Sequence, residues 1–344
     1  MKNPFSLTFG KEPQSLIRRG LQNFEIIDGF KDAPPTFQVC MITGVRGSGK
    51  TVSLTTIANE FREDKNWIVV DLSPERDMLN ALAAELSNRV ELLQIFRDAK
   101  INLSLLGLGL EIDGVPPITD IGVALERMLS KLTEKRKHVL ITVDEAVSNQ
   151  FVRQFASQYQ IYLRKNLNVY LIMTGLYENI YELQNINSLT FLYRAPKIEL
   201  KPLNIGLIAD SYQKIFEISE EESIQMAKAT QGYSFAYQVL GYLCFRDKKT
   251  WKEELTQFDA ILEEYVYEKI WSEVSNADKA VLTAMAQAGR TRVQEIRETI
   301  KFTSNEFTVY RSRLIRKGIL YSPSYGYIDF ALPRFREFVQ RQSF

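Results

Sequence analysis

The octapeptide GVRGSGKT, residues 44–51, constrains this chain more than any other stretch of its sequence. It follows the apolar run Thr36–Thr43 and precedes the amphipathic segment Val52–Phe61, so it joins a predicted strand to a predicted helix. Its three glycines let the backbone turn tightly and approach a ligand closely. Backbone N–H groups at such a turn, together with the positive end of the following helix, attract anions. The spacing therefore predicts a strand–loop–helix unit that grips phosphate.

The octapeptide satisfies the P-loop pattern G-x4-G-K-[ST], which binds the phosphates of nucleoside triphosphates. We expect Lys50 to reach the β and γ phosphates and the Thr51 hydroxyl to ligate Mg²⁺. The alternative is a glycine-rich turn before a purely structural helix, but the flanking strand and helix favour the P-loop. We expect a nucleoside triphosphate and Mg²⁺ as ligands, and the following binding residues: Gly44, Val45, Arg46, Gly47, Ser48, Gly49, Lys50, Thr51 and Val52.

An acidic strand end accompanies the P-loop. Asp144 and Glu145 directly follow the apolar run His138–Val143. At the carboxyl edge of a parallel strand, Asp144 can bind beside the nucleotide and hold the hydration shell of Mg²⁺. Glu145 is suited to orient water against the γ phosphate. Acids that end a strand are often solvated turn residues, but beside a P-loop the pair predicts hydrolysis, with Glu145 and Lys50 as candidate catalytic residues.

Two further candidate catalytic residues follow predicted strands. Thr174 ends the run Val169–Thr174, where a polar side chain would face the γ phosphate; it could instead form a Thr-Gly turn. Arg194 precedes the short strand Lys197–Leu200. Its guanidinium could stabilise transition-state charge in its own site or in a neighbour's, or it could pair with a surface carboxylate.

Strand and helix patterns alternate as far as about residue 201, and helical patterns follow. The predicted strands are Thr36–Thr43, Trp67–Leu72, His138–Val143, Val169–Thr174 and Lys197–Leu200. We expect an α/β fold whose P-loop NTPase core, residues 1–201, has three layers: a parallel sheet between two sets of helices. The stretch Ile101–Gly114 predicts an inserted hairpin. An α-helical lid is expected over 202–270. Three helices and a β-hairpin over 271–344 predict a C-terminal winged helix-turn-helix.

Composition is typical of a globular protein, with 45% hydrophobic and 25% charged residues. No run of eighteen apolar residues and no secretory leader are apparent, so we expect a cytoplasmic protein that does not enter a membrane. Cys40 and Cys244 lie in apolar segments, where a thiol usually acts as a small buried hydrophobe, as a reducing cytoplasm allows. The single histidine, His138, disfavours a His-based catalytic dyad or metal site.

The C-terminal segment is basic. Residues 290–341 contain eleven Lys/Arg against five Asp/Glu, whereas the whole chain has a net charge of +1. Within the winged-helix segment, Thr291–Ile300 is the expected first helix of the turn and Asn305–Lys317 the recognition helix, whose outward face would carry Asn305, Thr308, Ser312 and Arg316. This charge favours binding of double-stranded DNA, with Arg313, Arg316 and Lys317 as candidate contacts. The alternative is a solvated helix face on a module that contacts proteins.

In their order, these motifs resemble those of AAA+ ATPases of the origin-recognition and initiator branch, and of the related archaeal-type and signal-transduction ATPases. The phrases NPFSLTFG, VVDLSPERDML and TGLYENIYELQN look like bacterial members described as ATP-binding proteins. The resemblance implies that the nucleotide is ATP, with ADP as product, and that adenine contacts lie in the vicinity of Phe5, Ile17 and Arg18. It also implies a lid arginine or a Gly-x-Pro turn, where this chain has Gly232-Tyr233-Ser234, so we expect slow hydrolysis.

Two functions remain open on the sequence. In the first, ATP binding and hydrolysis reposition the winged helix to bind DNA, as in an initiator or loader. In the second, the chain is a signalling switch with slow turnover whose winged helix contacts a protein partner. Either allows a homo-oligomer or a partner protein. A small-molecule kinase is disfavoured by Glu145 and by the lid and winged-helix additions.

Overall fold

The computed structural model describes residues 2–8, 10, 12–289 and 292–342, and the chain divides into two compact units. The sheet unit consists of Gly20–Thr43 and Lys50–Glu199. The lid unit consists of the chain up to Arg19, the loop Gly44–Gly49 and the chain from Leu200 onward. The P-loop therefore begins in the lid unit and ends in the sheet unit.

The sheet unit is built on parallel strands at the positions that the sequence predicts. In the described part of the chain, five strands form one sheet in the order β2-β3-β4-β1-β5. Their bounds are β1 (Val39–Thr43), β2 (Trp67–Leu72), β3 (His138–Val143), β4 (Val169–Gly175) and β5 (Lys197–Glu199). The central strands β1 and β4 are buried along their whole length, as expected for a parallel sheet covered on both faces.

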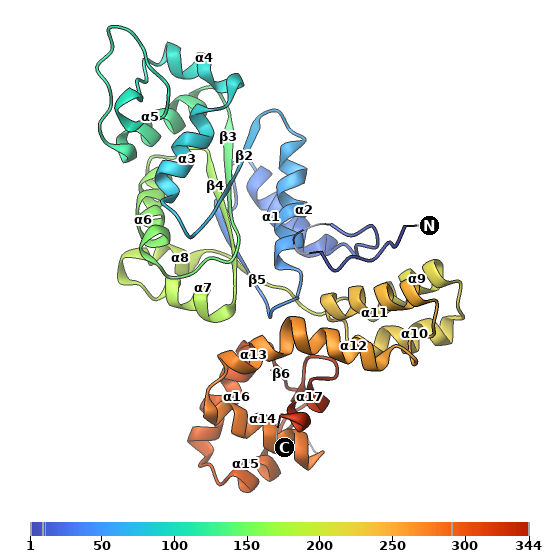
Figure 1. The fold of residues 1–344 in the computed structure, drawn as a ribbon. Coiled ribbons are helices and arrows are strands. Elements are labelled where there is room, and N and C mark those ends of the chain that lie inside the picture. Colours follow the sequence, from blue (N-terminus) through green and yellow to red (C-terminus); the bar gives the residue numbers. More distant parts are fainter. Residues whose placement is uncertain (1, 9, 11, 290–291, 343–344) are drawn as a thin grey trace. The chain divides into compact units, whose positions relative to one another are not determined.

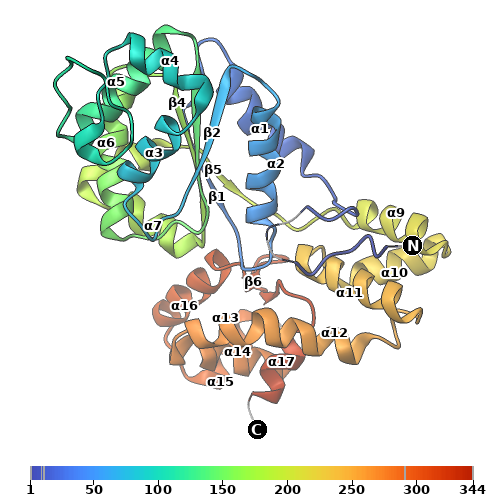
Figure 2. The ribbon, with the colours of Figure 1, turned by 45° about the horizontal axis from the view of Figure 1, so that its top comes forward.

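Helices cover both faces of this sheet, which confirms the three-layer prediction (Figures 1 and 2). One face packs against α1 (Gly20–Lys31) and α2 (Lys50–Arg62). The other carries α3 (Met78–Ser87), α4 (Val90–Asp98), α5 (Ile121–Glu134), α6 (Gln150–Arg164) and α7 (Tyr177–Gln184), followed by the short η2 (Asn187–Leu189) and α8 (Phe191–Arg194). Cys40 is buried in β1 as a free thiol, as expected.

The hairpin expected at Ile101–Gly114 is wrong. The segment contains a single 3₁₀ turn, η1 (Ser104–Leu106), and the Leu103 N–H donates to the Leu110 carbonyl at 2.7 Å. Gly107 and Gly109 both have φ of +69°, in the left-handed region. Two such residues bend the backbone repeatedly, so the alternating apolar residues close a compact loop instead of two paired strands.

The part of the lid unit that directly follows the sheet is helical, as predicted. The lid comprises α9 (Ile205–Phe216), α10 (Glu220–Ala229), α11 (Ser234–Asp247) and α12 (Leu255–Leu262). The π-helical turn η3 (Glu263–Tyr267) and α13 (Glu268–Glu273) continue α12. Cys244 is buried in α11 as a free thiol. Among the helices that the structure describes, none combines the length and the apolar character that a membrane crossing needs.

The winged-helix segment follows with three helices and a hairpin, in the predicted order. These elements are α14 (Asn276–Ala288), α15 (Val293–Ile300), α16 (Ser304–Arg316), β6 (Leu320–Tyr321) and β7 (Asp329–Phe330). Capping boxes at Ser275–Asp278 and Thr303–Glu306 begin α14 and α16. A further helix, α17 (Phe335–Arg341), ends the segment. Arg290 and Thr291, where the basic segment and the first helix of the turn were expected to begin, lie outside the described residues.

Candidate nucleotide-binding site

The P-loop adopts a conformation that only this pattern of glycines permits. Gly47 and Gly49 have φ of +70° and +92°, values that side-chain-bearing residues rarely adopt. A Cβ on Gly44 would collide with the Ser48 side chain. The Ser48 Oγ is buried and, within the described part of the chain, has no hydrogen-bond partner. Because buried polar atoms are nearly always paired, this orphan hydroxyl fits a loop whose remaining partner is a polar ligand.

Asp144 lies at the centre of a cluster in the sheet unit. The Thr51 Oγ1 donates to Asp144 Oδ2 at 2.7 Å, and the Thr174 Oγ1 donates to Asp144 Oδ1. The cluster forms because β3 and β4 are parallel neighbours whose carboxyl ends meet at one edge, with Val143 opposite Met173. Carboxylate and hydroxyl oxygens are ligands that suit Mg²⁺. The fold therefore brings together the two residues predicted for the metal, Thr51 and Asp144.

Glu145 follows with its side chain exposed and its backbone constrained. Its φ is +52°, in the left-handed region, which costs a non-glycine residue roughly 1–2 kcal/mol. The Glu145 N–H donates to Asp144 Oδ1 at 3.1 Å and to Thr174 Oγ1 at 3.2 Å. Those bonds hold the residue in this conformation. The backbone of Glu145 is therefore held by hydrogen bonds, while its side chain is open to solvent.

The P-loop carbonyls point at the first turn of lid helix α11. The residues Tyr233–Phe235, which we call the lid turn, donate to three successive carbonyls: Tyr233 Oη to Arg46 O at 2.5 Å, Phe235 N to Gly47 O at 3.1 Å, and Ser234 Oγ to Ser48 O at 3.0 Å. The sequence indicated Gly232-Tyr233-Ser234 only as a departure from a family pattern. In the structure, the same stretch provides hydrogen-bond donors to the P-loop backbone.

Arg19 is a further residue at the P-loop, which sequence reasoning missed. Its Nη2 donates to Ser48 O at 2.9 Å and to Ser234 Oγ at 3.1 Å, and its Nη1 donates to the Lys201 carbonyl. Burial lowers the pKa of Arg19 to about 10. No motif marks this residue, because the partner Ser234 lies 215 positions away. The neighbouring Arg18, named for adenine on the family resemblance, is exposed.

Other predicted residues lie apart from this arrangement. Phe5 is buried in the lid core, where its ring stacks on Phe216 with centroids 5.8 Å apart, and Ile17 packs against the same core. Phe5 therefore presents no free surface for adenine, whereas Ile17 is half-buried and its proposed contact stays a prediction. Arg194 ends α8 with an exposed side chain. Within the described residues it has no side-chain hydrogen bond or ion pair, so its role stays a prediction.

The winged-helix side of the lid unit also contacts the P-loop. Arg46 forms a forked ion pair with Glu273, the last residue of α13, at 2.7 and 3.2 Å. A Cβ on Gly318, which follows α16, would lie 3.3 Å from the Val45 Cβ. The P-loop is therefore close to the end of α13 and to the residue that follows α16.

The candidate DNA contacts differ in their surroundings. Arg313 pairs with the buried Asp278 at 2.7 Å and donates to Ser275 Oγ at 2.9 Å, so it fixes the start of α14. Arg316 is exposed, on the same outward face as the exposed Asn305 and Thr308 and the half-buried Ser312, as predicted. Lys317 is half-buried and adjoins Gly318 at the P-loop.

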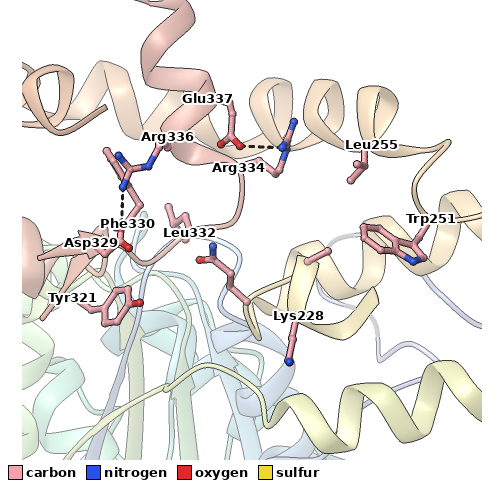
Figure 3. A pocket seen from close by; sticks show the side chains of 12 residues that line it. Lys228, Trp251, Leu255, Tyr321, Asp329, Phe330, Leu332, Arg334, Arg336 and Glu337 are labelled. Carbon is pink, nitrogen blue, oxygen red and sulfur yellow. Dashed lines mark hydrogen bonds and ion pairs between the residues drawn. The ribbon is translucent and has the colours of Figure 1, made fainter. Parts of the chain in front are cut away.

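A separate pocket of about 370 Å³ lies between the lid and the winged-helix segment (Figure 3). Its arginines are paired with carboxylates: Arg334 with Asp259 at 2.7 Å and with Glu337 at 2.9 Å, and Arg336 with Asp329 at 2.8 Å. The residues that line it include none from the P-loop. Because Asp259 belongs to α12 and Arg334 precedes α17, these pairs connect the winged-helix segment to the lid.

One family model and solved structures of similar fold match this chain. A family model described as a domain of unknown function, DUF8462, matches residues 264–339. None of the curated protein sequences matches the chain. The Walker-type ATPase of Pyrococcus abyssi has a similar structure, with 16% identity, a TM-score of 0.69, and coverage of 98% of this chain and 99% of that one. The chain shares its fold.

A second solved structure agrees with the first. The ORC2 protein of Aeropyrum pernix, in its ADPNP–ADP complexes, is 11% identical to this chain with a TM-score of 0.61. The similarity covers 97% of this chain and 96% of that protein. Both similarities extend over nearly the whole chain, so they include its sheet core, its lid and its terminal helices with the hairpin. The fold predicted from the P-loop and the downstream patterns is confirmed.

Proposed function

We propose that the chain binds and hydrolyses ATP with Mg²⁺, and that its nucleotide state repositions the winged-helix segment to bind double-stranded DNA. The observation that carries the proposal is the hydrogen-bonded cluster of Thr51, Asp144 and Thr174 beside the P-loop lysine. The ORC2 protein, of similar fold, is in complex with ADPNP and ADP. That complex supports an adenine nucleotide as the ligand.

Each residue has a defined task in this proposal. The P-loop N–H groups and Lys50 hold the phosphates. Thr51 and Asp144 hold Mg²⁺, which neutralises phosphate charge when it is bound. Glu145 orients the attacking water, and Thr174 fixes the carboxylate of Asp144 and the backbone of Glu145. Arg194, exposed at the end of α8, stabilises transition-state charge in its own site or in that of a neighbouring copy.

Binding and cleavage are separated by two substitutions. Lys50→Ala should abolish ATP binding, because the lysine supplies charge to the ground-state phosphates. Glu145→Gln should retain ATP binding and stop hydrolysis, because the carboxylate acts only on water. Calorimetric titration with ATP and a phosphate-release assay measure the two steps.

The matched controls are Lys65→Ala and Glu63→Gln, which alter exposed residues of the same charge in the sheet unit. Both should bind and hydrolyse ATP as the parent does. Equal hydrolysis by Glu145→Gln and the parent would remove the role of Glu145. Unchanged ATP binding by Lys50→Ala would remove the P-loop assignment.

A signalling switch with a protein partner is the second candidate. Exposed aromatic and apolar side chains of the winged-helix segment favour it. Tyr325, in the turn of the β6–β7 hairpin, is fully exposed, its neighbours Tyr321 and Tyr327 are 46% and 42% exposed, and Val309 of α16 is 60% exposed. Tyrosine is enriched in protein interfaces, where a large side chain can be buried at little entropic cost. ATPase assays with and without duplex DNA discriminate the two candidates: stimulation by DNA supports the first, and indifference to DNA supports the second.

A further inference from the structure

The lid turn holds P-loop peptide units whose orientation decides how the loop meets phosphate. In a trans peptide the C=O and N–H bonds point in opposite directions. The Arg46 carbonyl belongs to the same peptide unit as the Gly47 N–H, and the Ser48 carbonyl to the same unit as the Gly49 N–H. When the lid turn binds these two carbonyls, it directs both N–H groups away from the lid.

The intervening peptide unit is held from both ends, by the lid turn and by the loop itself. The Gly47 carbonyl accepts from Phe235 N, and its partner, the Ser48 N–H, donates to the Val45 carbonyl at 3.2 Å. Gly47 and Gly49, whose N–H groups are directed away from the lid, are the two P-loop residues with positive φ. Glycine has the freest backbone of any residue, so these two peptide units are the ones that most need an external restraint.

The contacts of the lid turn are closely fitted. Tyr233 is 5% exposed, and burial raises the pKa of its hydroxyl, which keeps it a neutral donor. A Cβ on Gly47 would collide with that hydroxyl. Arg19 adds a second donor to the Ser48 carbonyl and also binds Ser234, so the Gly49 peptide unit is restrained from two segments of the chain.

We propose that Tyr233, Ser234 and Arg19 are positioning residues for phosphate binding, which hold the Gly47 and Gly49 N–H groups in the orientation that phosphate requires. The inference rests on the proposed ATP binding and adds residues outside the P-loop motif to it. Because coupling between two equilibria is reciprocal, bound phosphate must also strengthen the attachment of the lid turn to the P-loop.

Tyr233→Phe removes one hydroxyl and tests the proposal directly. Tyr212→Phe is the matched control, because Tyr212 is also a buried lid tyrosine, whose hydroxyl donates to the Tyr237 carbonyl at 2.8 Å instead of to the P-loop. Losing one hydrogen bond and leaving a carbonyl unpaired should weaken ATP and ADP binding on the order of tenfold. The loss should appear in KM, and the control should bind both nucleotides within about twofold of the parent.

Amide hydrogen exchange of the nucleotide-free protein gives a readout that does not depend on ATP. Backbone amides in peptides covering 44–51 should exchange faster in Tyr233→Phe than in the parent or in Tyr212→Phe. If Tyr233→Phe does not fold, Ser234→Ala removes a different lid-turn donor and should show both effects.

Three results would overturn the proposal. Unchanged exchange over 44–51 would show that the lid turn does not restrain the loop, whether or not ATP binds. Equal nucleotide affinity in Tyr233→Phe and the parent would show that the restraint does not serve phosphate. Equal losses in Tyr233→Phe and Tyr212→Phe would reduce the effect to general weakening of the lid. A parent protein that binds no ATP, by contrast, would refute the proposed function itself, and with it the role of the lid turn in phosphate binding.

Discussion

At the scale of single residues, Asp144 organises the sheet side of the site. Its two carboxylate oxygens accept from different hydroxyls, Thr51 at the start of α2 and Thr174 at the end of β4. A carboxylate held from both sides has one orientation, so the ligand that we propose for Mg²⁺ is oriented before the ion binds. Thr174 is wholly buried. If its hydroxyl is removed, water cannot take over the hydrogen bond to Asp144 without a cost in free energy.

Thr174→Val should lower kcat by roughly tenfold or more while ATP affinity changes little, because one hydrogen bond to a charged group is lost from the hydrolytic side of the site. Thr174→Ser keeps the Oγ and should retain most activity. Steady-state kinetics of both variants check the prediction. A Val variant as active as the parent would make Thr174 a packing residue.

Residues whose position follows from the strand pattern could be placed from the sequence, and those whose contacts join distant segments could not. Asp144 and Thr174 end neighbouring parallel strands, so the pattern of strands alone places them together. Arg19 contacts both Ser48 and Ser234 only because α11 folds back onto the P-loop. Arg313 lies beside outward residues on the helix, yet its side chain turns to Asp278 of a preceding helix.

At the scale of elements, the P-loop is joined to α13 by the Arg46–Glu273 pair. Both side chains are about one-third exposed, at 32% and 34%, and Lys269 also approaches Glu273 at 3.4 Å. Burial alone would raise the pKa of Glu273, but the hydrogen bonds and charges of Arg46 and then Lys269 outweigh it and hold that pKa below its usual 4.5. The pair thus links the nucleotide loop to the helix that leads into the winged-helix segment.

A double-mutant cycle with Arg46→Ala and Glu273→Ala should give a coupling energy of about 0.5–1 kcal/mol in the free energy of unfolding, since solvent screens a partly exposed pair. A carboxyl with a lowered pKa stabilises the folded state above its unfolded pKa. The coupling should therefore be present at neutral pH and disappear as the pH falls through the folded pKa. Urea unfolding at pH 7 and over a series of pH values below 4.5 measures the coupling; a coupling that did not decrease as the pH falls would contradict the ion pair.

At the scale of the whole molecule, the basic C-terminal segment offers less positive charge to a partner than its composition suggests. Several of its arginines pair with acids that precede residue 290: Arg313 with Asp278, Arg334 with Asp259 and Arg341 with Glu263. A count over 290–341 includes the arginines and omits those acids, so it overstates the charge available to a partner. Sequence order could not reveal this, because the pairs depend on the packing of α12, η3 and α14 around the segment.

DNA binding should consequently depend on the exposed Arg316 and not on Arg313. Arg316→Glu should weaken binding to any duplex and reduce the slope of log affinity against log salt by about 0.9, the value for one phosphate contact. Arg97→Glu makes the same charge change at an exposed site of the sheet unit and should leave the slope unchanged.

ATP should also shift the DNA affinity of the parent and not that of Lys50→Ala. The reason is that Val45 and Arg46 of the P-loop lie against Gly318 and Glu273. Fluorescence anisotropy over a salt series measures each quantity. If the parent and Arg316→Glu bind duplex equally poorly at low salt, the DNA-binding candidate fails. The exposed tyrosines of the β6–β7 hairpin then become the better candidate for a partner surface, and the partner is a protein.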